Sequence, residues 1–317
     1  MKSMPTGWRW VVWIRLIALV LLLSSCVQHS ALSPWQSPLY RNHNLVGKIW
    51  SSADQSFVDE PQLWSALRNA DYIFLGEKHD NPDHHALQLT VLQQLIAEDL
   101  VAHATFEMLD SSADAALARL GEQDIDSLDQ LSRFLAWDEE GWDWSFYGPL
   151  VQALHQQDVP IRSGNITGET VGRVYGEPTP AEIAAVLDET VMEKLYEDID
   201  ASHCGLLPQS QFPAMVRVQQ TRDHRMAMQL GEPAAGKAAV LIAGNFHVRH
   251  DLGVPNYLLK QNSGLNRDDI ISLAFLEVQP GETDPAVYLE QFSQLPAYDF
   301  LWFTPAVTAE DYCDSLR

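Results

Sequence analysis

The chain has 317 residues, and its 43 acidic side chains outnumber its 20 lysines and arginines, so that the formal net charge is −23 at pH 7. Nucleic acid binding depends on neutralising phosphates with Lys and Arg, so this charge argues against nucleic acid as a partner. The length suits one large α/β domain with an insertion, and the sequence has no repeat of solenoid period and no low-complexity run.

The N-terminal segment has the order of features of a bacterial lipoprotein signal. Three basic residues precede or interrupt an apolar run at residues 11–23, which is too short and too close to the terminus for a mature membrane span. Leu-Ser-Ser-Cys follows at residues 23–26 and resembles a lipobox, so we expect Cys26 to be acylated after cleavage. The alternative is a free cysteine beside an uncleaved anchor.

The domain organisation follows from this signal. We expect a signal peptide at residues 1–25, a tether at residues 26–44 and one domain at residues 45–317, held to a membrane by the lipid. Some bacteria use an aspartate directly after the acylated cysteine as a retention mark. This chain has Val27 at that position, and the absence of the aspartate favours the outer membrane of the cell envelope.

The first clear strand signal is the apolar run at residues 71–75, which ends in Gly-Glu-Lys-His at residues 76–79. Aromatic and β-branched residues predict a buried strand here, and the glycine predicts a turn after it. In an open α/β sheet, ligands bind at the carboxyl ends of the strands. Glu77 and His79 are therefore candidate site residues.

A helix is predicted at residues 82–96, where the apolar residues have helical spacing. Asn81 suits the N-cap position of this helix, and Pro82 suits its first helical position. The helix places His84 and His85 in its first turn, close to the loop of His79. A second strand at residues 101–108 delivers Glu107 to the same edge of the sheet.

Residues 111–157 are predicted to be helical at 111–120, 127–136 and 146–157. The connection at residues 137–147 contains three tryptophans and ends in Tyr147. Such aromatic density is typical of core packing, and beside a site it could also form the wall of a flat aromatic ligand.

A third strand is predicted at residues 159–163, followed by a helical insertion at about 168–230. The apolar run from 238 then ends in a second Gly-x-x-His motif at residues 244–247, and a helix at 251–261 and strands at 270–278 and 299–303 follow. The expected fold is α/β, a Rossmann-like and mainly parallel sheet flanked by helices with an inserted helical subdomain. His79 and His247 should converge on one crevice.

Two further cysteines, Cys204 and Cys313, lie in the expected domain. An oxidising compartment would allow a disulfide between them. Their separation does not distinguish a disulfide from two buried thiols.

Several of these segments together resemble one family. The matching pieces, in chain order, are Gly-Glu-Lys-His-Asp at 76–80 with the two following histidines, Phe-Glu-Met at 106–108, Gly-Trp at 141–142 with Tyr-Gly-Pro-Leu at 147–150, Arg-Asp-x-x-Met-Ala at 222–227, and Gly-Asn-Phe-His-Val-Arg at 244–249 with Gly-Val-Pro at 253–255. They are similar to the ChaN family, haem-binding lipoproteins of the wider Tiki/TraB/erythromycin-esterase-like superfamily. The stretch Asn-Ile-Thr-Gly at 165–168 departs from the Asn-x-Pro-Arg that this family tends to have there.

The resemblance implies a haem-binding protein linked to haem or iron acquisition, in which a tyrosine ligates ferric haem and a homodimer brings two haems together. Tyr147 is the tyrosine in the family-like segment, and tyrosinate is a hard anion suited to Fe(III). His79, His84, His85 and His247 could hydrogen-bond this ligand or offer an imidazole nitrogen. Alternatively, Tyr147 only anchors the start of a helix, and another tyrosine such as Tyr175 is the ligand.

Two other functions are compatible with the motifs. In a hydrolase, Glu77, His79, Glu107 and His247 would hold a divalent metal ion that activates water, or Glu77 would act directly as a general base. The sequence contains neither a serine nucleophile motif nor HExxH, which counts against this alternative. The third possibility is a lipid-tethered adaptor whose crevice binds a partner. We favour haem binding without an enzymatic activity.

Overall fold

The computed structural model describes residues 34–310 and 312–315, and one compact unit begins at Trp35. The expected signal peptide at 1–25, Cys26 and the first part of the tether lie outside the described residues. The rest of the tether differs from the expectation, because the Gln36 and Ser37 N–H groups donate to the Asp83 carboxylate and Leu39 forms a backbone bridge with Ala306. The domain thus starts about ten residues before the expected boundary at 45.

The centre of the domain is one sheet of eight strands in the order β2-β1-β8-β7-β3-β6-β4-β5. β3 to β8 are parallel, and β1 is antiparallel to β2 and β8. The α/β fold predicted from the sequence is confirmed. The strands are β1 (Ile49–Ser51), β2 (Ser56–Val58), β3 (Tyr72–Glu77), β4 (Val101–Asp110), β5 (Ile161–Asn165), β6 (Ala238–Gly244), β7 (Ile270–Glu277) and β8 (Phe300–Thr304).

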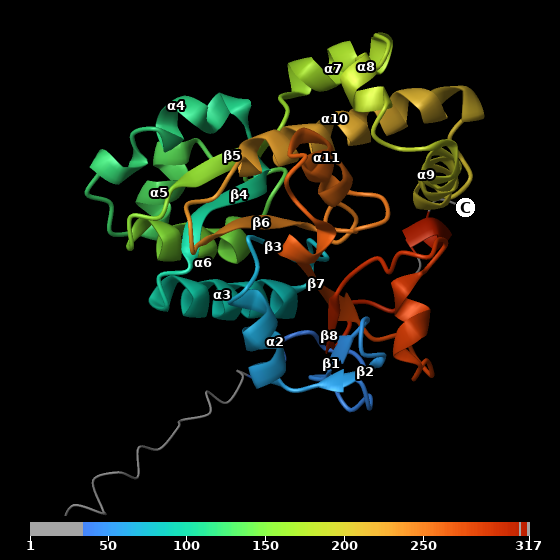
Figure 1. Ribbon diagram of the computed structural model, residues 1–317, viewed down its shortest axis with the longest axis horizontal. Coiled ribbons are helices and arrows are strands. Elements are labelled where there is room, and N and C mark those ends of the chain that lie inside the picture. Colours follow the sequence, from blue (N-terminus) through green and yellow to red (C-terminus); the bar gives the residue numbers. More distant parts are fainter. Residues whose placement is uncertain (1–33, 311, 316–317) are drawn as a thin grey trace, which may run out of the picture. The chain divides into compact units, whose positions relative to one another are not determined.

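Helices cover both faces of this sheet (Figure 1). On one face lie α3 and α6, and on the other lie α10 and α11. Every residue of β3 and β6 is buried, as expected for central parallel strands that are covered on both sides. The helices are α2 (Glu60–Leu67), α3 (Pro82–Ala97), α4 (Asp114–Leu117), α5 (Leu128–Leu135), α6 (Trp144–His155), α7 (Gly168–Gly176), α8 (Ala181–Ala184), α9 (Glu189–Ser202), α10 (Phe212–Leu230) and α11 (Val254–Gln261).

The start of α3 follows the predicted capping chemistry. The Asn81 side chain accepts hydrogen bonds from the N–H groups of Asp83 and His84, and Pro82 occupies the first helical position. This arrangement fixes the turn between β3 and α3, and with it the position of His79.

The helical insertion expected at about 168–230 is smaller in the structure. α10 packs against β4, β5 and α11, so it completes one layer of the domain, and only α7, α8 and α9 depart from the sheet (Figure 1). Helical spacing shows that a segment has an apolar face, but it does not show which surface that face covers.

β1, β2 and α2 were not predicted from the sequence. β1 and β2 have three residues each, too few for an alternating pattern to be visible. β1 pairs with β8, so these strands extend the sheet beyond its parallel part. No helix among residues 34–310 and 312–315 is long and apolar enough to cross a membrane.

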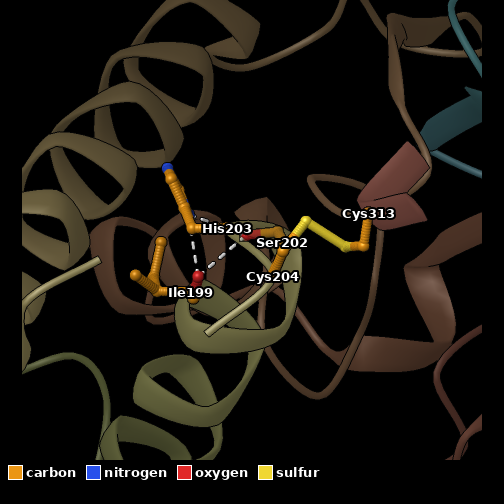
Figure 2. The surroundings of a disulfide bond; sticks show 5 residues. All are labelled: Ile199, Ser202, His203, Cys204 and Cys313. Carbon is orange, nitrogen blue, oxygen red and sulfur yellow. Dashed lines mark hydrogen bonds between the residues drawn. A yellow bond between two sulfur atoms is a disulfide. The ribbon is translucent and has the colours of Figure 1, made fainter. Parts of the chain in front are cut away.

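Cys204 and Cys313 form a disulfide, which resolves the two alternatives left open by the sequence. Their Cα atoms are 5.4 Å apart, and 109 positions separate them in the chain. Figure 2 shows that Cys204 lies just beyond the end of α9, where the His203 ring hydrogen-bonds the carbonyl of Ile199. The bridge joins this end of α9 to the short C-terminal helix η6 (Tyr312–Ser315).

Candidate functional site

The two Gly-x-x-His motifs lie side by side at the carboxyl edge of the sheet. The parallel register of β3 and β6 pairs Glu77 with Gly244. A Cβ atom on Gly244 would lie 2.9 Å from Cε1 of His79, so only glycine lets the His79 ring approach this closely. Glu77, His79, Glu107 and His247 all border one open cavity of about 780 Å³, as the sequence predicted.

Glu77, His79 and Tyr147 form the first of two side-chain clusters at this edge. The Tyr147 hydroxyl donates to Oε1 of Glu77 at 3.0 Å, and Nδ1 of His79 lies 2.5 Å from the same oxygen. Burial, reinforced by the Glu77 carboxylate, raises the pKa of Tyr147 far above its ordinary value. Burial alone would lower the pKa of His79, but the hydrogen bond to Glu77 and the charges of Glu77 and Glu107 together outweigh burial and raise this pKa.

Tyr147 and His79 differ in their exposure and in their position relative to the cavity. Tyr147 is a neutral phenol that is only 1% exposed, and it does not border the cavity. The His79 side chain is 45% exposed, and its ring packs edge-on against Trp142 at 4.9 Å between centroids. Nδ1 of His79 is held by Glu77, whereas Nε2 forms no hydrogen bond with the described residues.

His247 is the centre of the second cluster. Its Nδ1 contacts Oδ1 of Asp223, and its Nε2 lies 3.3 Å from Oε1 of Glu107. The second Glu107 oxygen accepts the Gly244 N–H at 2.8 Å. The cluster therefore joins β4, β6 and α10 through one imidazole ring.

Charge is concentrated in this second cluster. Burial alone would lower the pKa of His247, but Glu107 and Asp223 outweigh it and raise the pKa to about 10. Burial alone would raise the pKa of Glu107, but the charge and hydrogen bond of His247, together with the charge of His79 and the Gly244 N–H, outweigh burial and lower the pKa to about 2. Burial raises the pKa of Asp223, and His247 only partly opposes this. At neutral pH His247 is an imidazolium whose two N–H groups face carboxylates, so it has no lone pair to offer a metal.

His84 and His85 support the loop of His79 in this structure. The Lys78 N–H donates to Nδ1 of His84 at 2.8 Å, so Nε2–H of His84 donates to the Thr304 hydroxyl at 2.9 Å. Burial lowers the pKa of His84 well below its ordinary value, which keeps the ring neutral. Nε2 of His85 lies 3.1 Å from the His79 carbonyl, and its ring stacks on Phe146. The ring nitrogens of both histidines thus already have partners within the protein.

The cavity has one apolar wall and one polar edge. Trp142 and Phe246 border it together with Leu195 and Ile199 of α9 and Val216 of α10. Of the tryptophans in the 137–147 connection, only Trp142 borders this cavity, because Trp137 and Trp144 pack against each other with centroids 4.8 Å apart. Trp137 and Trp144 therefore pack within the protein, and Trp142 is the tryptophan of this segment that a ligand in the cavity could contact.

These features fit a haem group. The volume lies within the roughly 300–1,000 Å³ of small-molecule sites, which are mostly apolar with a few placed polar groups. A free divalent ion fits less well. In the part of the chain that the structure describes, no group of three or more His, Cys, Asp or Glu side chains is arranged to hold a metal ion.

Sequence reasoning missed the contribution of α10. Gln219 and Asp223 lie one turn apart on this helix, and both contact the His247 ring. Asp223 was noted only as part of an Arg-Asp pair. Asp223 is only 2% exposed, and a buried carboxylate needs a charged partner, which His247 supplies from another element.

Comparison with known proteins supports this fold. A structure of ChaN of Campylobacter jejuni, described as binding haem cofacially, aligns over 84% of this chain and 98% of that chain with a TM-score of 0.64 and 22% identity. A mutant of the erythromycin esterase EreC aligns over 84% and 99% with a TM-score of 0.45 and 12% identity. No curated protein sequence matches the chain. The family described as "Haem-binding uptake, Tiki superfamily, ChaN" matches residues 63–258, more than half of the chain. This confirms the family indicated by the sequence motifs: the chain belongs to the ChaN family of haem-binding uptake proteins.

Proposed function

We propose that this protein binds ferric haem in the cavity at the carboxyl ends of β3, β4 and β6 and acts in haem or iron acquisition. The observation that carries this proposal is the combination of an aromatic wall at Trp142 with the partly exposed imidazole of His79 at the polar edge. A flat macrocycle could pack on the wall while its iron meets a ligand from this edge.

Two side chains are candidates for the iron ligand. The family resemblance implies a tyrosine, for which Tyr147 is the candidate, and tyrosinate suits ferric iron. Tyr147 would first have to give up its proton, and Glu77 at 3.0 Å is the base in position to accept it. The geometry favours His79, because a metal-binding histidine commonly donates its second ring N–H to a carboxylate, as His79 does to Glu77.

Titration with haemin distinguishes the two ligands. With His79 as ligand, His79→Ala should weaken haemin binding about tenfold or more and shift the visible absorption bands, since even loss of a residue that only supports a metal ligand costs roughly 10–100-fold. Tyr147→Phe should then have a smaller effect. His155→Ala, which changes a histidine away from the cavity border, is the matched control.

Other outcomes of this titration have definite meanings. An unchanged spectrum in His79→Ala together with lost binding in Tyr147→Phe would assign the iron to Tyr147. A wild-type protein that does not bind haemin would overturn the proposed function. Sedimentation of the same samples tests the homodimer that the family resemblance implies, which should form only when haemin is bound.

We also propose that the protein is a lipoprotein anchored to the outer membrane through Cys26. Two or more acyl chains hold a protein stably on a membrane, whereas one gives only marginal binding. Cys26→Ser should therefore leave the precursor uncleaved or release the protein into the soluble fraction, as seen by membrane fractionation and mass spectrometry. A Cys26→Ser protein that is still cleaved and still sediments with membranes would contradict the anchor.

The metal-dependent hydrolase receives no support from the site. Its proposed ligand His247 donates to Glu107 and Asp223. Glu77 is engaged by both Tyr147 and His79 through the same oxygen. We therefore do not propose a hydrolytic activity for this site.

A further inference from the structure

One face of α10 forms a wall of the cavity. Val216, Gln219 and Arg222 follow one another at intervals of three residues, and all three border the cavity. Gln219 contacts His247, and Val216 belongs to the hydrophobic core. This leaves Arg222 as the cationic residue on this wall.

Arg222 differs from the other cations at the cavity. Lys78 pairs with Asp80 at 2.7 Å, and Arg249 pairs with Asp251 at 2.8 Å. The Arg222 guanidinium forms no hydrogen bond or ion pair with the described residues, and its Nε is buried without a partner. The terminal nitrogens of Arg222 are not buried, unlike Nε, so they are the donors that an acceptor arriving with a ligand in the cavity could meet.

The surrounding charges determine what that acceptor can be. The cavity is bordered by the carboxylates of Glu77, Glu107, Asp198, Glu277 and Glu290. They would repel an anionic ligand group across most of the polar edge. The charge of Arg222 acts on Asp223, but among the described residues Arg222 forms no ion pair with a carboxylate, so an anionic group has a favourable place to bind there.

We propose that Arg222 binds a carboxylate of the ligand and thereby sets its orientation in the cavity. This inference rests on the proposed function, in which the ligand is haem, a flat ring system that carries two propionate carboxylates. The planar guanidinium can accept a carboxylate through two parallel hydrogen bonds, which lysine cannot reproduce. One propionate then lies against α10, while the macrocycle lies on the apolar wall and the second propionate remains free to face solvent.

The test compares haemin with haemin dimethyl ester, which keeps the ring and the iron but carries no carboxylate. Wild-type protein should bind haemin roughly tenfold or more tightly than the ester, as expected for a charge-assisted hydrogen bond. Arg222→Gln should weaken the binding of haemin but not of the ester, so that the difference in affinity between the two ligands disappears. Arg222→Lys should retain part of this difference. Arg173→Gln, at an exposed arginine of α7 that does not border the cavity, is the control and should bind both ligands as wild type does.

The outcomes separate this inference from the proposed function. If Arg222→Gln weakens haemin and the ester equally, or weakens neither, Arg222 does not contact a ligand carboxylate and the inference is wrong. If wild-type protein binds neither compound, the proposed function itself fails. Thermal unfolding of each variant without ligand shows whether the fold is kept.

Discussion

Replacing Cys204 and Cys313 together by serine is expected to lower the free energy of unfolding by about 4–5 kcal/mol. The disulfide closes a loop with a sequence separation of 109, and the chain-entropy model assigns about 4.7 kcal/mol to a loop of roughly 100 residues. Urea unfolding of the double variant under oxidising conditions measures the loss. Wild-type protein in a reductant should unfold at the same urea concentration as the double variant.

The same substitution should act locally on the cavity. Leu195, Ile199 and Ser202 of α9 border the cavity, and Cys204 follows two residues after this helix ends. Without the disulfide, the end of α9 loses its covalent link to η6, so backbone amides of α9 should exchange hydrogen faster while those of β3 and β6 stay protected. Equal stability and equal exchange in the wild type and the double variant would show that the bridge does not support this wall.

The sequence predicted the parts of the site that depend on local signals. Residues 71–79 and 238–247 each combine an apolar run with Gly-x-x-His, and parallel strands bring such ends to one edge. The structure confirms this through the pairing of Glu77 with Gly244. The N-cap at Asn81 likewise depends only on its neighbours, and it was predicted correctly.

The partners of these residues come from distant segments that carry no local signal of the contact. Tyr147 lies 70 positions from Glu77, and Asp223 lies 24 positions from His247. Helical spacing placed both on helices but could not show which side chain each would meet. For the same reason, the sequence could not distinguish a histidine that borders the cavity, such as His79, from one that braces a loop, such as His85.

The second large effect is expected for His247→Ala, which should lower the free energy of unfolding by about 3–5 kcal/mol. Removing one member of a buried ionic cluster leaves the remaining charge uncompensated. In this protein Glu107 and Asp223 would face each other across the space of the lost ring, and both are at least 95% buried. Combining His247→Ala with Glu107→Gln should cost less than the two separate losses added together, because the double variant keeps one carboxylate fewer.

The pH dependence of stability shows whether the loss comes from charge. The pKa of His247 is raised from 6.5 to about 10 in the folded protein, so its stabilisation is complete below pH 6.5 and is lost as the pH rises to about 10. Wild-type stability should therefore fall between pH 7 and 10, whereas His247→Ala should show little of this fall. His103→Ala is the control, because His103 is buried and burial lowers its pKa to about 4, so it is neutral throughout this range. His103→Ala should be less stable than wild type at every pH and should retain the wild-type slope. If His247→Ala kept the full slope, the charge on His247 would not be what holds β4, β6 and α10 together at the edge of the cavity.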